Sequence, residues 1–245
     1  MTARFYVPDL DPAVRVVRLP PEEAHHLVKV LRLGAGENVA VFDGRGNEWL
    51  ARVESAARSG VDVSLVEPIV RPQPAVALTL VQAVLKGEAM DGVIRDCTMI
   101  GVAAIQPVQT ARTTVKTAAM TAAPARWRRI ALASAKQCGA SRLPDVRDVV
   151  SFDQCMERAP RGAAFVLVEP SVAVAPVTVR ELASRPAPTE ASLLVGPEGG
   201  WTGEERDRAI AAGCAALSLG PMTLRAAAVP LAAAAILLAI WDSAG

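Results

Sequence analysis

The stretch LLVGPEGGWTGEE, residues 193–205, combines three features that together indicate the architecture of the chain. Its apolar beginning is typical of a buried strand, and that strand ends at a glycine. Thr202 and Glu205 then have the spacing of a capping box, which predicts that a helix begins directly after the loop. A strand, a glycine loop and a helix in this order place the loop at the carboxyl end of a parallel strand, where open α/β sheets bind ligands.

The glycine loop indicates the kind of ligand that it would suit. Gly196, Gly199 and Gly200 allow a close approach of the backbone to a flat ligand and permit positive φ. The loop lacks both GxxxxGK[ST] and GxGxxG, and Glu198 would repel phosphates. An adenosine-type ligand with a positive charge and no phosphate fits better, and S-adenosylmethionine (SAM), a sulfonium, meets that description. An ordinary tight turn with a good helix cap is the alternative interpretation.

The stretch LSLGPMTLR, residues 217–225, repeats this arrangement of a buried strand followed by Gly-Pro. Its Arg225 borders an uncharged segment, residues 226–241, and therefore stands where the core meets solvent. The helix dipole disfavours a cation at an N-terminus, which favours a functional role for Arg225 as much as the alternative interpretation of a solvated arginine at the helix end. The uncharged segment contains Pro230 and is shorter than the roughly 20 residues that cross a bilayer. It predicts a helix buried in a core or a dimer interface.

Outward from these stretches, apolar strands alternate with helical patterns through residues 73–245. Such alternation predicts a parallel sheet covered by helices on both faces. The helical pattern of residues 88–101, for example, places four apolar side chains on one face. These side chains are Met90, Val93, Ile94 and Cys97.

Residues 1–72 have a different pattern, with short strand-like stretches separated by turn signals such as DGRGN at 43–47. One helix-like insert, residues 21–34, begins with acidic residues and ends with basic ones. Three prolines within residues 66–76 break any regular element and mark a boundary. The fold class predicted from these patterns is α/β, with a small, mostly β domain of barrel type at 1–72 and a larger domain at 73–245.

The composition limits the kinds of partner. A net charge of +1 over 245 residues excludes a strong global field, so nucleic-acid binding would require local clusters of Lys and Arg. The two histidines are neighbours and the cysteines form no CxxC, so we expect no metal site and reduced core cysteines. The beginning of the chain lacks the apolar region of a secretory signal, and we expect a cytoplasmic protein. The four cysteines are Cys97, Cys138, Cys155 and Cys214.

GPEGG after a strand, followed by LxLGxxxLR and a terminal apolar helix, resembles the SPOUT methyltransferases, whose C-terminal chain forms a deep trefoil knot. More closely, the chain resembles the bacterial 16S rRNA uracil-N3 methyltransferase family from end to end. The order and spacing of several blocks carry this resemblance. These blocks are RFYV (4–7), HHLVKVLRLGAGENVAVFDGRGNEW (25–49), LKGEAMDGVIRDCTMIGV (85–102), IQPVQTAR (105–112), RWRRIALASAKQCGASRLPDV (126–146) and the two knot motifs.

The resemblance implies a SPOUT-type knotted domain at 73–245, a PUA-like β-barrel that binds RNA at 1–72, and SAM held in the knot by backbone atoms of three loops. The matching cofactor positions are Val168, Glu169, Val195, Gly196, Pro197, Glu198, Gly199, Gly200, Leu219, Gly220, Thr223 and Leu224. Arg225 matches the knot arginine and would stabilise the anion of a uracil that is methylated at N3. The matching or basic candidates for RNA contacts are Arg4, His26, Lys29, Arg32, Lys86 and Arg112. The resemblance further implies the small ribosomal subunit as partner, a homodimer through the knot domain, and neither a metal nor a membrane.

Five positions depart from the family pattern, each by loss of a polar group. Met99 stands for a glutamate, Ala140 and Met222 for arginines, and Ala227 and Ala228 for Glu and Thr. Losing such groups together avoids leaving a buried partner unpaired, which would cost about 1–3 kcal/mol. Three functions therefore stay open: an active 16S rRNA uridine methyltransferase, a non-catalytic RNA-binding relative, and a SPOUT methyltransferase with another RNA target.

Overall fold

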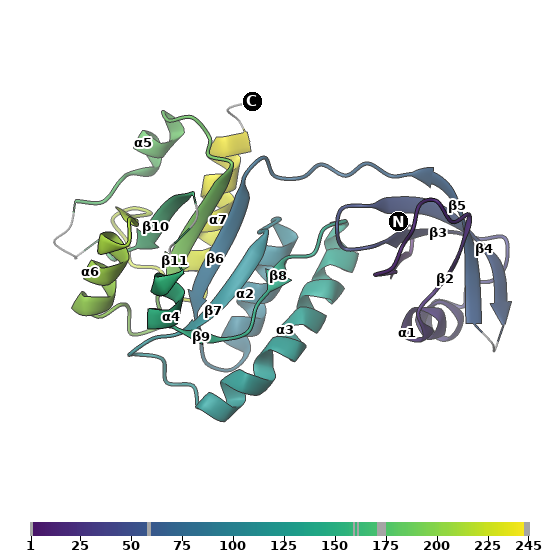
Figure 1. The fold of residues 1–245 in the computed structure, drawn as a ribbon, viewed down its shortest axis with the longest axis horizontal. Coiled ribbons are helices and arrows are strands. Elements are labelled where there is room, and N and C mark those ends of the chain that lie inside the picture. Colours follow the sequence, from purple (N-terminus) through teal and green to yellow (C-terminus); the bar gives the residue numbers. More distant parts are fainter. Residues whose placement is uncertain (1, 58–59, 159, 161, 171–174, 243–245) are drawn as a thin grey trace. The chain divides into compact units, whose positions relative to one another are not determined.

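The structure, a computed structural model, describes residues 2–57, 60–158, 160, 162–170 and 175–242. The chain divides into two compact units (Figure 1). The N-terminal unit comprises residues 1–72 together with 135–143, and the C-terminal unit comprises residues 73–134 and 144–245. Residues 135–143, which the sequence pattern placed in the larger domain, thus pack with the smaller unit.

The N-terminal unit is built on one five-stranded, mostly antiparallel sheet. The strand order is β1 (Arg4–Tyr6), β3 (Asn38–Phe42), β4 (Glu48–Ala57), β5 (Gly60–Pro68) and β2 (Val16–Arg18), with β1 parallel to β3. Alternate residues of these strands, among them Phe5, Val41 and Val63, are buried in a core of their own. The small, mostly β domain expected from the turn-separated strand patterns is confirmed.

The helix-like insert of this unit is shorter than predicted and changes type. Helix α1 (Pro21–His25) begins with proline at its first position, which suits the fixed φ of that residue. A π-helix, η1 (His26–Leu31), follows without a break and ends at Arg32, whose φ of 57° is left-handed. The sequence predicted one helix over 21–34, because apolar periodicity alone does not distinguish an α-turn from a π-turn.

A buried ion network joins distant parts of the N-terminal unit. Glu48, 1% exposed, accepts hydrogen bonds of 3.0 Å from Nε and Nη2 of Arg4 and of 3.1 and 3.0 Å from Arg71. Arg4 is 8% exposed and also donates to the carbonyls of Ala135 (2.6 Å) and Ala140 (2.9 Å). Burial by itself would raise the pKa of Glu48, but the hydrogen bonds and charges of Arg71 and Arg4 outweigh it and lower that pKa. The network ties residues 135–140 to the sheet.

The C-terminal unit contains a parallel sheet, as predicted. Its strand order is β12 (Ala215–Leu217), β10 (Ala163–Leu167), β11 (Glu190–Val195), β6 (Ala77–Ala83), β7 (Ala104–Gln109) and β8 (Asp145–Val146), with β9 (Val150–Ser151) also beside β7. Every pairing in this sheet is parallel. The trefoil knot stays a prediction.

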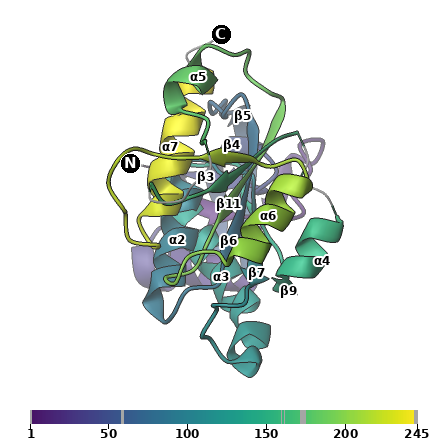
Figure 2. The ribbon, with the colours of Figure 1, turned by 90° about the vertical axis from the view of Figure 1, so that its left-hand side faces the viewer.

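Helices cover both faces of the parallel sheet (Figure 2). One face carries α2 (Glu88–Met99), α3 (Thr117–Cys138), α5 (Val179–Ala183) and α7 (Val229–Asp242), and the other carries α4 (Phe152–Glu157) and α6 (Gly203–Ala211). The predicted apolar face of α2 is confirmed, since Met90, Val93, Ile94 and Cys97 are all buried. Helix α3 begins at Thr117 and includes Pro124, whereas the sequence placed the helical pattern from residue 126 onward.

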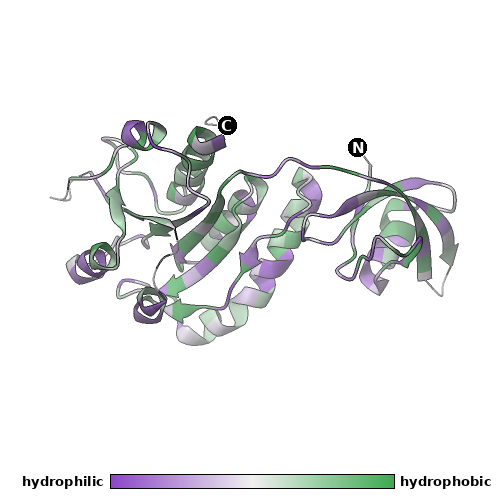
Figure 3. Ribbon diagram, turned by 45° about the horizontal axis from the view of Figure 1, so that its top comes forward, coloured by the Kyte–Doolittle hydropathy of each residue, from purple (hydrophilic) through white to green (hydrophobic). Residues whose placement is uncertain are grey.

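Helix α7 is apolar from Val229 to Trp241 and ends at the charged Asp242, so most of it is green in Figure 3. It has 14 residues and contacts β6, β11, α2 and α5. No helix in the described part of the chain has both the length and the apolar character that a bilayer crossing requires. The predicted packed helix is confirmed from Val229 onward by the buried face of α7, whereas residues 226–228 form a turn before it.

The prediction that all four cysteines lie in the core is wrong for Cys138, whereas the partly buried Cys155 packs against a core cluster. Cys97 and Cys214 are buried, and burial raises the pKa of Cys97 to about 12 and that of Cys214 to about 11. Cys155 is half-buried and Cys138 is exposed. Cys138 follows helical periodicity, but it lies in the last turn of α3, where the helix face leaves the core.

Candidate functional site

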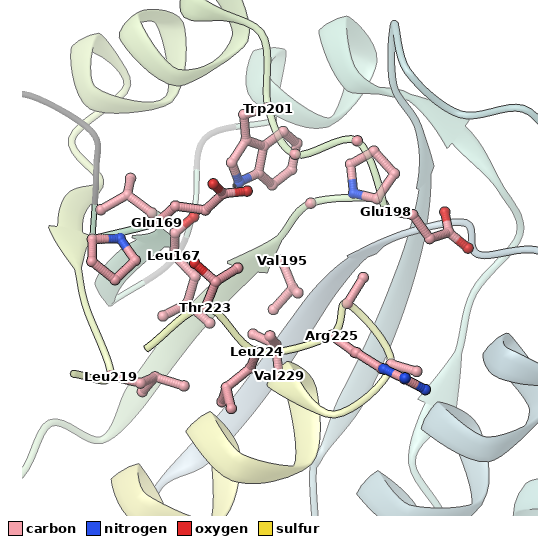
Figure 4. Close-up of a pocket in the computed structure, with 18 of the residues that line it drawn as sticks. Leu167, Glu169, Val195, Glu198, Trp201, Leu219, Thr223, Leu224, Arg225 and Val229 are labelled. Atoms are coloured by element: carbon pink, nitrogen blue, oxygen red, sulfur yellow. Dashed lines mark hydrogen bonds between the residues drawn. The ribbon is translucent and has the colours of Figure 1, made fainter. Parts of the chain in front are cut away.

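A pocket of about 680 Å³ lies at the carboxyl ends of β12, β10 and β11, which are neighbours in the sheet (Figure 4). It is lined by residues 167–170 at the end of β10, by residues 195–201 at the end of β11 and by most of residues 218–229 after β12. This volume falls within the range of roughly 300–1,000 Å³ that is typical of small-molecule sites. All twelve residues matched to the cofactor loops from the sequence, and Arg225, contribute to its wall.

The glycines of the β11 loop are closely packed within the protein. A Cβ on Gly196 would lie 3.3 Å from the ring of Trp201, and one on Gly200 would lie 3.3 Å from Oε1 of Glu169. Gly200 also has a φ of +68°, and its N–H closes a turn to the carbonyl of Pro197 at 2.9 Å. At Gly220, with a φ of +140°, no atom lies within 4 Å of the Cβ position, so the bare backbone expected from the sequence borders open space there.

Trp201 joins the β11 loop to the end of β10. Its Nε1 donates a hydrogen bond of 3.1 Å to the carbonyl of Leu167, and its ring lies 5.5 Å from that of Phe152. Trp201 lines the pocket but was not among the site residues predicted from the sequence. The tryptophan next to Gly199 and Gly200 could have indicated a site residue from the sequence. A partly buried indole N–H requires an acceptor, which predicts that Trp201 is bonded to a neighbouring loop.

The helix after the loop begins as the sequence predicted. Thr202 Oγ1 accepts from the N–H of Glu205 at 3.1 Å, and Glu205 Oε2 accepts from the N–H of Thr202 at 3.0 Å, so the capping box is confirmed. Glu205 Oε1 is occupied as well, by the N–H of Ala111 at 2.7 Å. The carboxylate of Glu205 is therefore structural, and Glu205 is not among the residues that line the pocket.

The charged side chains of the pocket wall differ in what they contact. Arg112 donates to the carbonyl of Gly199, and Arg206 is paired with Asp207 at 2.9 Å. The side chain of Arg225 is exposed and forms no hydrogen bond or ion pair with any residue that the structure describes. Figure 4 shows Glu169 beside Trp201, and Glu198 with Arg225 on the opposite side of the pocket. Arg225 is thus the arginine of the wall whose guanidinium is available to a ligand.

This donor set suits SAM. Glu169 and Glu198 line the pocket and can balance the charge of a sulfonium, while two of the three arginines of the wall, Arg112 and Arg206, are bonded to protein groups. Apolar side chains that can pack against an adenine surround the middle of the pocket. These are Leu167, Val195, Leu219, Leu224 and Val229.

The positions that depart from the family pattern lie in three places. Met222, 77% exposed, and Ala227 line the pocket, and Ala228 lies directly before the first residue of α7. Met99 ends α2, and Ala140 belongs to the N-terminal unit, where its carbonyl accepts from Arg4. The pocket therefore has a more apolar rim than the family pattern implies.

The six candidates for RNA contacts are not equivalent. Arg4 is buried against Glu48, so its guanidinium is not available to RNA. His26 is half-buried, with its ring 6.3 Å from that of Phe5, while Lys29 and Arg32 are exposed along η1. Val30 and Leu31 between them are exposed too.

The other two candidates belong to the C-terminal unit and lie beside the pocket. The side chain of Lys86 is exposed, and its N–H donates to Glu198 Oε1 at 3.2 Å. Arg112 lines the pocket. Among the described residues, no three His, Cys, Asp or Glu side chains gather as a metal site would require.

Comparison with known proteins identifies two domain families. Residues 71–238 match the model of an RNA methyltransferase domain, and residues 19–66 match that of an RNA methyltransferase PUA domain. The first match covers the parallel sheet and all three pocket loops.

Similar whole proteins and structures agree with these matches. The ribosomal RNA small subunit methyltransferase E of Synechocystis sp. is 33% identical over 93% of this chain and 74% of its own length. The Mycobacterium bovis protein of the same name is 31% identical over 98% and 93%. The crystal structure of the Neisseria gonorrhoeae protein of that name, bound to SAM, has a TM-score of 0.86 and 29% identity, with 98% of both chains covered. A SAM complex of a Legionella pneumophila methyltransferase has a TM-score of 0.85 and 30% identity, with the same coverage.

Proposed function

This chain belongs to the RNA methyltransferase family, and from that premise we propose that it is a SAM-dependent methyltransferase that modifies N3 of a uridine in 16S rRNA of the small ribosomal subunit. The observation that carries the proposal is the single pocket formed by three strand-end loops, which combines glycine backbone, two carboxylates and Arg225. The similar SAM-bound structures support the same cofactor here. They do not favour a non-catalytic relative.

The residues of the pocket divide the work between cofactor and acceptor. The backbone of residues 168–169, 195–200 and 219–224 would hold SAM, and Glu169 and Glu198 would balance its charge. When bound, SAM supplies an electrophilic methyl group on a positively charged sulfur. A uridine whose N3 approaches this pocket must lose its N3 proton, and negative charge then spreads to the uracil oxygens. Arg225, unpaired at the pocket rim, is placed to stabilise that charge.

The proposal is tested by SAM binding and by product identity. We expect isothermal titration calorimetry to show about one SAM site per subunit, and purified protein to methylate small subunits from a strain that lacks its gene. Mass spectrometry of digested rRNA should then detect 3-methyluridine at one position. Binding of SAM with methylation of another RNA or base would assign a different target, and the absence of SAM binding would refute the enzyme.

We further propose that the protein acts in the cytoplasm as a homodimer through α7. One side of this helix exposes Leu231, which is 36% accessible, and Ala235. Ile236 and Ile240 are half-buried. An exposed helix face in a globular protein is normally polar, so a face of this composition calls for a covering surface. A second copy of the same face, packed by two-fold symmetry, would cover it.

The dimer proposal predicts a change in mass on substitution of one residue. At micromolar concentration, light scattering coupled to size exclusion should give the dimer mass for the natural protein and the monomer mass for Leu231→Arg, because the new charge would be buried unpaired. Ile210→Arg is the matched control, since Ile210 on α6 is 37% exposed and equally apolar. It should stay a dimer. A monomeric natural protein would contradict the proposal.

A further inference from the structure

The loop after β7 is hydrogen-bonded to the loop after β11, although their sequences are far apart. Arg112 Nη1 donates to the carbonyl of Gly199 at 2.6 Å and to that of Trp201 at 3.3 Å. The neighbouring Ala111 N–H donates to Glu205 Oε1 at 2.7 Å. Strand β6 lies between β7 and β11 in the sheet, so these bonds connect the two loops past the end of β6.

The aliphatic part of Arg112 packs closely against Gly199. A Cβ on Gly199 would lie 3.3 Å from Cδ and 3.5 Å from Cβ of Arg112. The first of these distances is closer than ordinary van der Waals contact between carbon atoms. The arginine stem thus occupies the space that a side chain at position 199 would need, while its guanidinium holds the carbonyls on either side of Gly200.

We infer that Arg112 is a positioning residue for the SAM loop, whereas the sequence analysis assigned it to RNA. The inference rests on the proposed SAM site. A segment with three glycines has wide conformational freedom, and ordering it on ligand binding costs entropy. A charge-assisted bond from Arg112 to two loop carbonyls restricts residues 196–201 before the ligand arrives, which improves affinity through preorganisation.

The first test compares SAM affinity and RNA affinity in the same variants. In calorimetry without RNA, Arg112→Ala should raise the Kd for SAM about tenfold, the effect of losing one hydrogen bond to a charged group. The Kd of Arg112→Lys for SAM should lie between those of the natural protein and Arg112→Ala, because an ammonium keeps the charge but lacks the planar fork that reaches both carbonyls. Arg208→Ala, which removes an exposed arginine of α6 that is paired with Asp153 of α4, is the control and should bind SAM normally.

Kinetics and RNA binding distinguish positioning from RNA contact. For Arg112→Ala we expect a higher KM for SAM, an unchanged kcat at saturating SAM, an unchanged Kd for rRNA and an unchanged melting temperature without ligand. A normal Kd for SAM together with weaker rRNA binding would overturn the inference in favour of a phosphate contact. Failure of the natural protein to bind SAM would instead refute the proposed function.

A double-mutant cycle tests the contact itself. Gly199→Ala should weaken SAM binding in the natural background, because the new methyl group displaces the stem of Arg112. In the Arg112→Ala background the same change has room, so its additional effect on the Kd should be smaller. Residues in contact show such non-additivity. Additive effects of the two substitutions would show that Arg112 does not act through Gly199.

Discussion

Replacement of Arg225 by alanine is expected to lower kcat for rRNA methylation by about 10²–10³-fold, the usual loss when one preorganised donor to a developing anion is removed. Arg225 is exposed at the pocket rim, and its side chain forms no hydrogen bond or ion pair with a described residue. Its removal therefore leaves no protein group unpaired, and stability should stay unchanged. The effect should fall on kcat, because the uracil acquires its negative charge only as N3 loses the proton.

Single-turnover kinetics on small subunits, with calorimetry of SAM binding in parallel, would measure this prediction. Arg225→Lys should recover part of the rate, because it keeps the charge and loses the planar fork. Arg208→Ala on α6 controls for the loss of an exposed arginine. If Arg225→Ala has a normal kcat, Arg225 is the solvated helix-end arginine that the sequence left open, and the acceptor would be stabilised by another group.

Replacement of Glu48 by alanine is expected to lower the free energy of unfolding of the N-terminal unit by about 3–5 kcal/mol, as breaking a buried ion pair does. Glu48 is the shared partner of Arg4 and Arg71, and its carboxylate is fully enclosed. Without it, the buried guanidinium of Arg4 keeps its carbonyl partners and loses its counter-charge. The first thermal transition should then fall by more than about 10 °C in a domain of this size.

Urea unfolding followed by tryptophan fluorescence would measure this loss, with Glu54→Ala as the matched control. Glu54 lies on the same strand, β4, is exposed, and accepts a single bond from Ser64, so its removal should cost within about 0.5 kcal/mol. A cost below about 1 kcal/mol for Glu48→Ala would contradict a tightly coupled network. Glu48→Gln measures the contribution of the charge separately from that of the side-chain shape, because the amide has nearly the same shape and keeps one acceptor oxygen.

The lowered pKa of Glu48 adds a dependence on pH. Because the folded value lies below the ordinary 4.5, its contribution to stability is complete above that pH and is lost as the pH falls through the folded value. The natural protein should therefore lose stability more steeply below pH 4.5 than Glu48→Ala, which has no carboxylate to protonate.

Much of the architecture was predictable because it depends on neighbouring residues. Patterns of side chains within a few positions predict the buried strands of the parallel sheet and the apolar face of α2. The capping box at Thr202 likewise depends on one residue three positions away. The three cofactor loops were found because each follows such a strand and because their motifs resemble a known family. Their meeting at one pocket follows from the parallel sheet, whose carboxyl ends share an edge.

The tertiary structure alone decided which charged residues are structural. Arg4 and Arg112 both matched candidates for RNA contacts, and in sequence nothing separates them from Lys29 or Arg32. Arg4 is 44 residues from Glu48 and Arg112 is 87 residues from Gly199, and these partners meet only in the folded chain. A hydrophobic pattern is local because burial on a helix or strand repeats with its period. The role of a charge depends on the group that faces it, and here folding brought that group from a distant part of the chain.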